Sequence, residues 1–238
     1  MAKDMSDWSR FERLTPFRVR DVLLVASPFD HYLLEESGYL VEIMRQEYAE
    51  LNLSQSPRII HSREARDALR LIRNRQFDLV ITMARVGSMD VNAFGREVKS
   101  IVADMPVILL SHNTRELATL HAGDGIDRIF VWTGDSRILL SICKLIEDEK
   151  NVAYDVNDAD VQVILLVEDS RRFYSAYLPL LYTQLVKQTV RLMGEGGNLD
   201  EKLLRLRARA KILLATDMQS ARSIIDRYHN NIIGVFTD

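Results

Sequence analysis

The chain has 238 residues, of which 47% are hydrophobic and 27% charged, a balance typical of globular proteins. The formal net charge is -3, so there is no surplus of Lys and Arg for non-specific nucleic-acid binding. The single cysteine, Cys143, excludes an internal disulfide and a multi-cysteine metal site.

The start of the chain, MAKDMSDWSR, is charged and lacks the apolar core of a secretory signal. No segment of the sequence approaches the roughly 18 apolar residues needed to cross a bilayer. We therefore expect a cytoplasmic protein with no membrane partner. Residues 1–19 are interpreted as an N-terminal extension.

Residues 20–150 alternate short apolar runs with amphipathic stretches. The predicted strands are 21–26, 58–60, 77–83, 106–111 and 127–132, and the predicted helices are 31–51, 63–75, 92–104, 114–122 and 136–150. Such alternation predicts an α/β fold, with a parallel sheet that carries helices on both faces. We expect a doubly wound five-stranded sheet in the order 2-1-3-4-5.

The pattern pauses at 151–160, where Asn and Asp are frequent and large apolar residues are few, which indicates a linker. It then restarts as the first half of a second copy, 161–238. Strands are predicted at 161–167, 211–215 and 231–238, and helices at 170–193, 199–209 and 220–229, with a break at 194–198. The helix 199–209 is an insertion, and Pro179 predicts a kink or a late start of the helix before it.

Three acids stand at predicted strand ends of the second copy. Glu168 and Asp169 follow its first strand, and Asp238 ends its third. In a doubly wound sheet the carboxyl ends of strands one and three lie side by side. Three carboxylates there would form an oxygen-ligand site for Mg²⁺, and an aspartate beside the ion is a candidate nucleophile toward phosphate.

This arrangement resembles the response-regulator receiver (CheY-like) domain, a flavodoxin-like fold. The resemblance rests on LLVEDS, with Glu168 and Asp169 at the family's acidic pair, and on IGVFTD, with Asp238 at its phosphoacceptor. It implies Mg²⁺ as the cofactor and a histidine kinase or phosphotransfer protein as the partner. The family's Thr or Ser and Lys positions lie past Asp238, so the second copy is interpreted as a truncated receiver.

The first copy resembles the same family but lacks its chemistry. In FDLVITMARVGSMD the phosphoacceptor position falls on Met83, and the acidic pair falls on Ala26 and Ser27. MPVILLSHN places Ser111 at the hydroxyl position, and GIDRIFVWTGD places Trp132 where the family has lysine. Residues 20–150 are therefore interpreted as a pseudo-receiver, which neither binds Mg²⁺ nor accepts phosphate.

Three further stretches, PFRVRDVLLVASPFD, FDLVITMARVGSMD and LLVEDSRRFYSAYLP, are similar to the N-terminal region of some bacterial phosphoenolpyruvate synthase-like proteins. That likeness leaves open a second role, as a non-phosphorylated regulatory or dimerisation domain of a larger enzyme. The chain itself is not expected to be an enzyme. SPFDHY and EDSRRF follow the two first strands, and neither is a glycine-rich phosphate loop.

Several other residues receive structural interpretations. In LRLRARAK, the basic residues Arg205, Arg207, Arg209 and Lys211 favour a solvated helix face over a nucleic-acid patch. His31 and His121 are interpreted as inert surface histidines rather than phosphate relays, and Cys143 as a small core residue. The apolar strand 231–238 would lie at an open sheet edge, which predicts self-association of the second copy as a dimer.

Overall fold

The computed structural model describes residues 13–30, 32, 56–112, 123, 125–132, 134–135, 137–192 and 208–237. They divide into two compact units. The first unit comprises the described residues within 19–139, and the second those within 13–18 and 140–237. The helices predicted at 31–51, 114–122 and 199–209, and the break at 194–198, fall largely or wholly outside the described residues.

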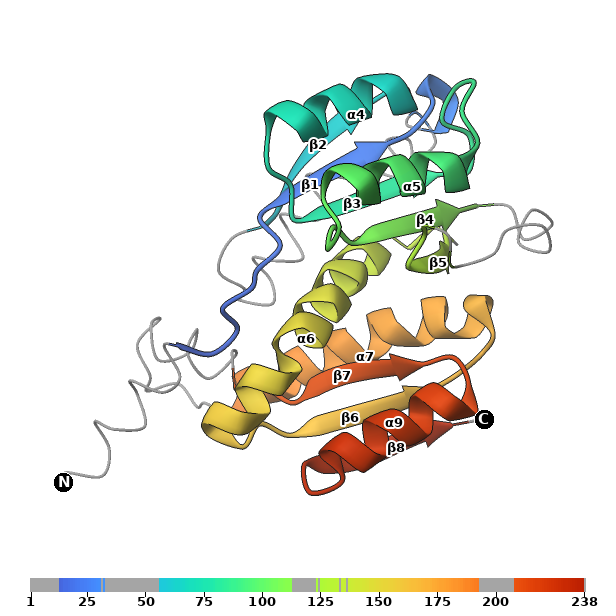
Figure 1. Ribbon diagram of the computed structural model, residues 1–238. Helices are drawn as coiled ribbons and strands as arrows, with labels where there is room; N and C mark the ends of the chain where they lie inside the picture. The colour runs from blue at the N-terminus through green and yellow to red at the C-terminus, as the bar shows by residue number, and fades with distance from the viewer. Residues whose placement is uncertain are drawn as a thin grey trace. The chain divides into compact units, whose positions relative to one another are not determined.

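The first unit is built on a parallel sheet with strand order β2-β1-β3-β4-β5, which confirms the predicted fold class and order (Figure 1). Its strands are β1 (Asp21–Val25), β2 (Arg58–Ser62), β3 (Leu79–Met83), β4 (Val107–Ser111) and β5 (Arg128–Val131). Every residue of β3 and β4 is buried. Strands that are covered on both faces need apolar residues at every position, which is why these runs do not alternate.

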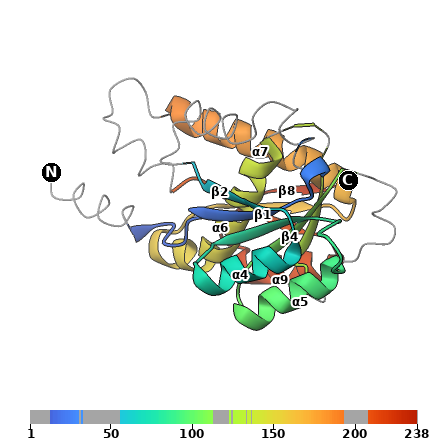
Figure 2. The ribbon, with the colours of Figure 1, turned by 90° about the horizontal axis from the view of Figure 1, so that it is seen from above.

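Two helices, α4 (Ala65–Asn74) and α5 (Val91–Ile101), lie together on one face of this sheet (Figure 2). Asp90 caps α5, because its Oδ1 accepts the backbone N–H groups of Asn92 and Ala93, each at 3.0 Å. A Cβ built on Gly95 of α5 would lie 2.6 Å from the carbonyl oxygen of Gly125. Only glycine allows this close approach of helix and loop.

The helix α6 (Arg137–Ala159) begins in the first unit and continues in the second. The linker predicted for 151–160 is therefore wrong over 151–159, and the two units divide within the helix rather than after it. The Asn and Asp side chains were the reason for that prediction. Asn151 and Asp155 are instead fully buried and bind other segments of the second unit, so they do not act as turn residues.

The second unit holds a parallel sheet with strand order β7-β6-β8, made of β6 (Val163–Val167), β7 (Lys211–Ala215) and β8 (Ile232–Thr237). Figure 2 shows α7 (Arg171–Leu192) and α9 (Met218–Tyr228) on opposite faces of it. Pro179 lies inside α7, which starts at Arg171 and so does not start late. The order is that of strands two, one and three of the first sheet.

Among the described residues, no helix combines the length and the apolar character that a membrane span requires. Cys143 is fully buried, in line with its predicted place in the core. Burial raises the pKa of its thiol, and the nearby Glu147 carboxylate raises it further. The cysteine is therefore held as an unreactive thiol.

Candidate functional site

The carboxyl ends of β1, β3 and β4 converge in the first unit, where a doubly wound sheet places its ligand site. Met83, the last residue of β3, is 2% exposed. Ala26, at the end of β1, is fully buried, and Ser27 follows it half-buried. The side chains at these three positions include no carboxylate.

A different acid lies beside them. Asp30 is 5% exposed, and its Oδ2 accepts a hydrogen bond from the Ser27 hydroxyl at 2.7 Å. The Ser27 oxygen in turn accepts the backbone N–H of Asp30 at 3.1 Å. Oδ1 of Asp30 faces Nε2 of His112, just after β4, at 3.8 Å. Nothing in the sequence pattern predicted this pairing.

A pocket of about 310 Å³ opens at this end of the sheet. Its lining combines polar and apolar residues: Ser27, Phe29, Asp30, Met83, Ala84, Arg85, Leu110, Ser111 and His112. Ser111, the predicted strand-end hydroxyl, is buried within it. Trp132 is half-buried and is not among the lining residues.

The corresponding end of the second unit carries two of the three predicted acids. Glu168 is 2% exposed, and its Oε1 accepts the backbone N–H of Ser170 at 2.9 Å. Asp169 is exposed. In the sheet register, Val167 of β6 is paired with Thr237, the last described residue of β8. Asp238 lies outside the described residues.

A second pocket, of about 300 Å³, lies at this end of the second unit. Its lining is mostly apolar: Leu166, Val167, Glu168, Tyr177, Leu180, Leu181, Phe236 and Thr237. Within the described part of the chain, no three His, Cys, Asp or Glu side chains are grouped closely enough to hold a metal ion. Of the three acids predicted at this end, the described residues include Glu168 and Asp169.

The two edges of the second sheet differ. The backbone N–H of Ile212, in the edge strand β7, donates to Oδ2 of Asp148 from α6 at 3.0 Å. The other edge strand, β8, exposes Ile233 (56%), Val235 (49%) and Phe236 (49%). Within the described residues β8 is paired only with β6, and it contains no charged residue or proline. Apart from a register irregularity at Ile233, between its pairs with Val163 and Ile164, the described residues of β8 include none of the charges or prolines that prevent edge pairing.

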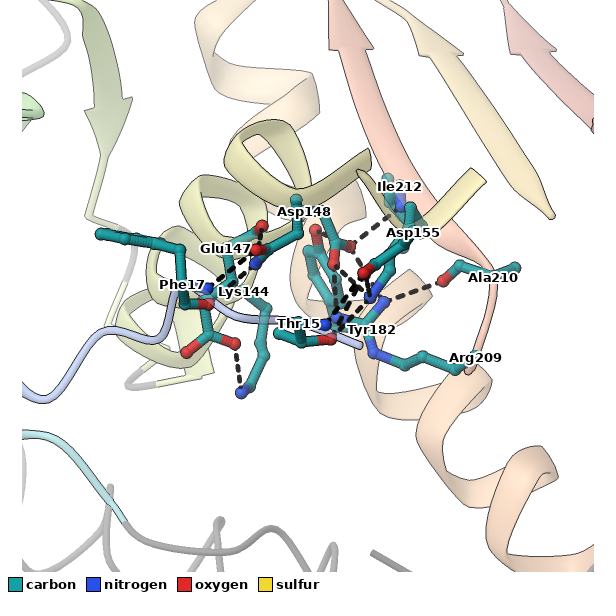
Figure 3. A network of polar contacts seen from close by, with 12 residues as sticks. Thr15, Phe17, Lys144, Glu147, Asp148, Asp155, Tyr182, Arg209, Ala210 and Ile212 are labelled. Atoms are coloured by element: carbon teal, nitrogen blue, oxygen red, sulfur yellow. Dashed lines mark hydrogen bonds and ion pairs between the residues drawn. The ribbon is translucent and has the colours of Figure 1, made fainter. Parts of the chain in front are cut away.

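A buried network of charges joins α6, α7 and β7, and nothing in the sequence pattern predicted it (Figure 3). The Asp148 carboxylate accepts two hydrogen bonds from the Arg209 guanidinium, at 2.8 and 2.9 Å. It also accepts one from the Tyr182 hydroxyl at 3.0 Å. Burial, reinforced by the Asp148 charge, raises the pKa of Tyr182. Burial acts to lower the pKa of Arg209, but the charges of Asp148, Tyr182 and Glu147, with the hydrogen bond to Asp148, together raise that pKa.

The same network extends to the N-terminal segment. Lys211 Nζ lies 2.8 Å from Oδ2 of Asp155 and donates to the Thr15 hydroxyl at 3.0 Å. The Thr15 N–H donates to Oδ1 of Asp155 at 2.9 Å (Figure 3). Burial lowers the pKa of Lys211, while the two aspartates act to raise it. Two residues on, the Phe17 backbone and the Asn151 side chain exchange two hydrogen bonds, at 2.9 and 2.7 Å.

These contacts correct the interpretation of LRLRARAK as a solvated helix face. Arg209 and Lys211 are 7% and 1% exposed, and they neutralise Asp148 and Asp155 inside the unit. They are therefore unavailable to nucleic acid. Arg205 and Arg207 lie outside the described residues, as do His31 and His121.

No family model matches the chain, and a search of curated proteins found no match. Solved receiver structures are similar to it over little more than half its length. The signal receiver domain of an HD domain-containing protein from Pseudomonas fluorescens Pf-5 is 20% identical, with TM-score 0.44, over 58% of this chain and 94% of that one. The CheY-like receiver from Methanospirillum hungatei JF-1 is 16% identical, with TM-score 0.42, over 57% and 98%.

The receiver domain of a signal transduction histidine kinase from Syntrophus aciditrophicus is 23% identical, with TM-score 0.41, over 55% of this chain and 91% of that one. Identities and TM-scores this low leave the function to be argued from the strand order and the site residues of this chain.

Proposed function

We propose that the chain is a response-regulator-like signalling module of a phosphorelay, in which only the second unit carries phosphate chemistry. The proposal rests on a strand order that both sheets share and on the different residues at the carboxyl ends of strands one and three in each sheet. Both sheets contain the order 2-1-3. Where the first has Met83, Ala26 and Ser27, the second has Glu168 and Asp169, with Asp238 directly after β8 in the chain.

In this proposal the first unit does not accept phosphate. A thioether such as that of Met83 has no oxygen to form an acyl phosphate, and its side chain is buried. After β1 the described residues of the first unit offer one buried carboxylate, Asp30, instead of an acidic pair, which gives Mg²⁺ fewer of the carboxylate ligands that it prefers. We expect this unit to transmit or scaffold a signal rather than to receive phosphate.

In the second unit Glu168, Asp169 and Asp238 would hold Mg²⁺, which offsets the repulsion between a carboxylate and a phosphoryl group. An Asp238 oxygen attacks the phosphorus of a phosphohistidine on a histidine kinase or phosphotransfer protein. The P–N bond breaks, the imidazole nitrogen leaves and takes up a proton, and Asp238 becomes an acyl phosphate. The reaction adds a phosphoryl group to the chain with no net oxidation or reduction.

Phosphate uptake from acetyl phosphate tests this proposal on the native full-length protein. With Mg²⁺ present we expect one phosphate per chain, and none after chelation of the metal. Asp238→Asn and Asp169→Asn should abolish the uptake. Asp226→Asn, on the exposed surface of α9, is the matched control and should take up phosphate as the unchanged protein does. Uptake that persists in Asp238→Asn would refute the proposal.

We also propose that the second unit self-associates as a dimer through β8 when β8 is the edge strand; a fourth strand on that edge, as in the first sheet, would replace this contact. A strand from a second copy supplies the backbone donors and acceptors that an open edge needs, and it covers Ile233, Val235 and Phe236. The other edge strand, β7, already has the Ile212 N–H bound by Asp148. A β8–β8 contact is therefore the pairing that this sheet favours.

Light scattering on the full chain tests the dimer. Val235→Lys places a charge in the open edge strand and should give a monomer. Met218→Lys adds the same charge at another highly exposed apolar residue of the unit, outside β8, and should remain dimeric. A strictly monomeric unchanged protein at high concentration, or a dimer that survives Val235→Lys, would contradict the proposal.

A further inference from the structure

The first unit keeps a pocket where its phosphate chemistry has been lost. The pocket lies at the carboxyl ends of β1, β3 and β4 and has a volume of about 310 Å³. That is the low end of the range found for small-molecule sites. If the unit served only as a scaffold, neither this cavity nor a buried carboxylate in its wall would be needed.

The Asp30 carboxylate is the negative element of this wall. One of its oxygens, Oδ2, is held by the Ser27 hydroxyl, which fixes the orientation of the side chain. Its other oxygen, Oδ1, lies 3.8 Å from His112 Nε2, beyond hydrogen-bond length. A carboxylate accepts about four hydrogen bonds. Asp30 therefore retains capacity for a donor from a bound molecule, and an ammonium group satisfies both its charge and its hydrogen bonding.

The positive element is Arg85, and His112 adds an imidazole; both residues are exposed and line the same pocket. An arginine guanidinium matches a carboxylate in shape and hydrogen-bond geometry, with two parallel N–H donors. The buried Ser111 hydroxyl adds a polar group beside them. The pocket thus holds a negatively charged hydrogen-bond acceptor, Asp30, and a positively charged hydrogen-bond donor, Arg85, in one small volume.

We propose that this pocket binds a small zwitterion of the free amino acid class. The ammonium group of the ligand binds Asp30, and its carboxylate binds Arg85 with support from His112. Phe29, Met83 and Leu110 form an apolar wall for the ligand's side chain. In this assignment Met83 contacts a ligand where a receiver has its phosphoacceptor.

Two other ligand classes fit less well. A free phosphate could pair with Arg85 but would be repelled by the buried Asp30 charge and would leave it without a cationic partner. A divalent cation would find one carboxylate, and no group of three metal-binding side chains exists among the described residues. The mixed charges of the lining therefore favour a ligand that itself carries both charges.

Calorimetric titration of the full chain with the free L-amino acids tests the proposal. At least one should bind with a millimolar or lower dissociation constant. Its decarboxylated amine and its N-acetyl derivative should each bind roughly ten-fold or more weakly, because each lacks one charge-assisted hydrogen-bond partner. Failure of all the free amino acids to bind would overturn the proposal, as would equal binding of the amine or the acetylated form.

Substitutions locate the binding. Asp30→Asn and Arg85→Gln should each weaken it roughly ten-fold or more. Arg85 is exposed, so its variant keeps the fold even if Asp30→Asn destabilises the unit. Asp67→Asn and Arg73→Gln, on α4 and outside the pocket lining, make the same charge changes and should leave binding unchanged. Undiminished binding in both pocket variants would place the ligand elsewhere and refute the assignment.

Discussion

The two units share a central strand order but are stabilised by different means. The first is a complete five-stranded sheet over an apolar core formed with α4 and α5. The second has three strands and depends on buried charges that join α6, α7 and β7. The difference teaches that the same central strand order can be combined with an apolar core in one unit and with a buried charge network beside an edge strand in the other.

The residues at the carboxyl ends of the strands also differ between the two sheets. In the first unit two buried residues, Met83 and Asp30, line a pocket that contains both acidic and basic side chains. In the second, an acidic pair adjoins a mostly apolar pocket. We propose that the same topological position binds a small ligand in one unit and accepts phosphate in the other.

Asp148→Ala should cause the largest loss of stability, and that loss should fall on the second unit. It leaves the Arg209 guanidinium buried without its carboxylate and frees the Ile212 N–H and the Tyr182 hydroxyl. Breaking a buried pair in this way costs about 3–5 kcal/mol. Denaturant unfolding should show that loss in the second unit alone. Asp226→Ala, at an exposed site in the same unit, should stay within about 0.5 kcal/mol of the unchanged protein.

Gly95→Ala should destabilise the first unit by a smaller amount. The added Cβ would lie 2.6 Å from the Gly125 carbonyl oxygen, so α5 or the loop must shift. Overpacking of this kind costs about 1–3 kcal/mol. Thermal unfolding followed by circular dichroism measures the loss, with Glu97→Ala on the exposed side of α5 as the control. An unchanged unfolding temperature would show that the close approach of α5 to Gly125 does not require glycine at position 95.

The smallest effect is expected at Asp217, which caps α9 by accepting the Ser220 backbone N–H at 2.7 Å. That bond, with the Ser220 side chain, lowers the pKa of Asp217. A lowered pKa means that the ionised cap stabilises the fold above the ordinary carboxyl pKa of about 3.9 and that this contribution fades as the pH falls through the folded-state value.

Asp217→Ala should therefore lower the unfolding temperature of the second unit slightly near neutral pH and by less in acid. Asp217→Asn keeps an accepting oxygen and should retain most of the cap, but without the pH dependence. Scanning calorimetry at several pH values measures this. A deficit of Asp217→Ala that grows as the pH falls would contradict the role assigned to the carboxylate.

The strand order could be predicted from the sequence because each strand is a short apolar run with its own helical stretch. β3 and β4 are buried at every position, and such runs carry a strong local signal. The end of α6 could not be predicted in the same way. Asn151 and Asp155 favour turns in isolation, and only their partners Phe17, Thr15 and Lys211 make a buried helix favourable.

The candidate sites differ in how much of each could be predicted from the sequence. The acidic pair Glu168 and Asp169 is adjacent in sequence and follows a strand, so its position was visible without a structure. The pairing of Asp30 with Ser27 and His112 joins residues from two strand ends, and the receiver pattern directs attention away from Asp30. Arg209 and Lys211 look like surface charges because their carboxylate partners lie about 60 residues away in the chain.

The central claim is that phosphate chemistry belongs to the second unit and not to the first. Borohydride reduces an aspartyl phosphate to homoserine, so peptide mass spectrometry after acetyl phosphate, Mg²⁺ and borohydride treatment locates the modified residue. The account predicts homoserine at position 238 and no modified residue within 19–139. A modified residue in the first unit, or unmodified Asp238 in the native full-length protein, would contradict it.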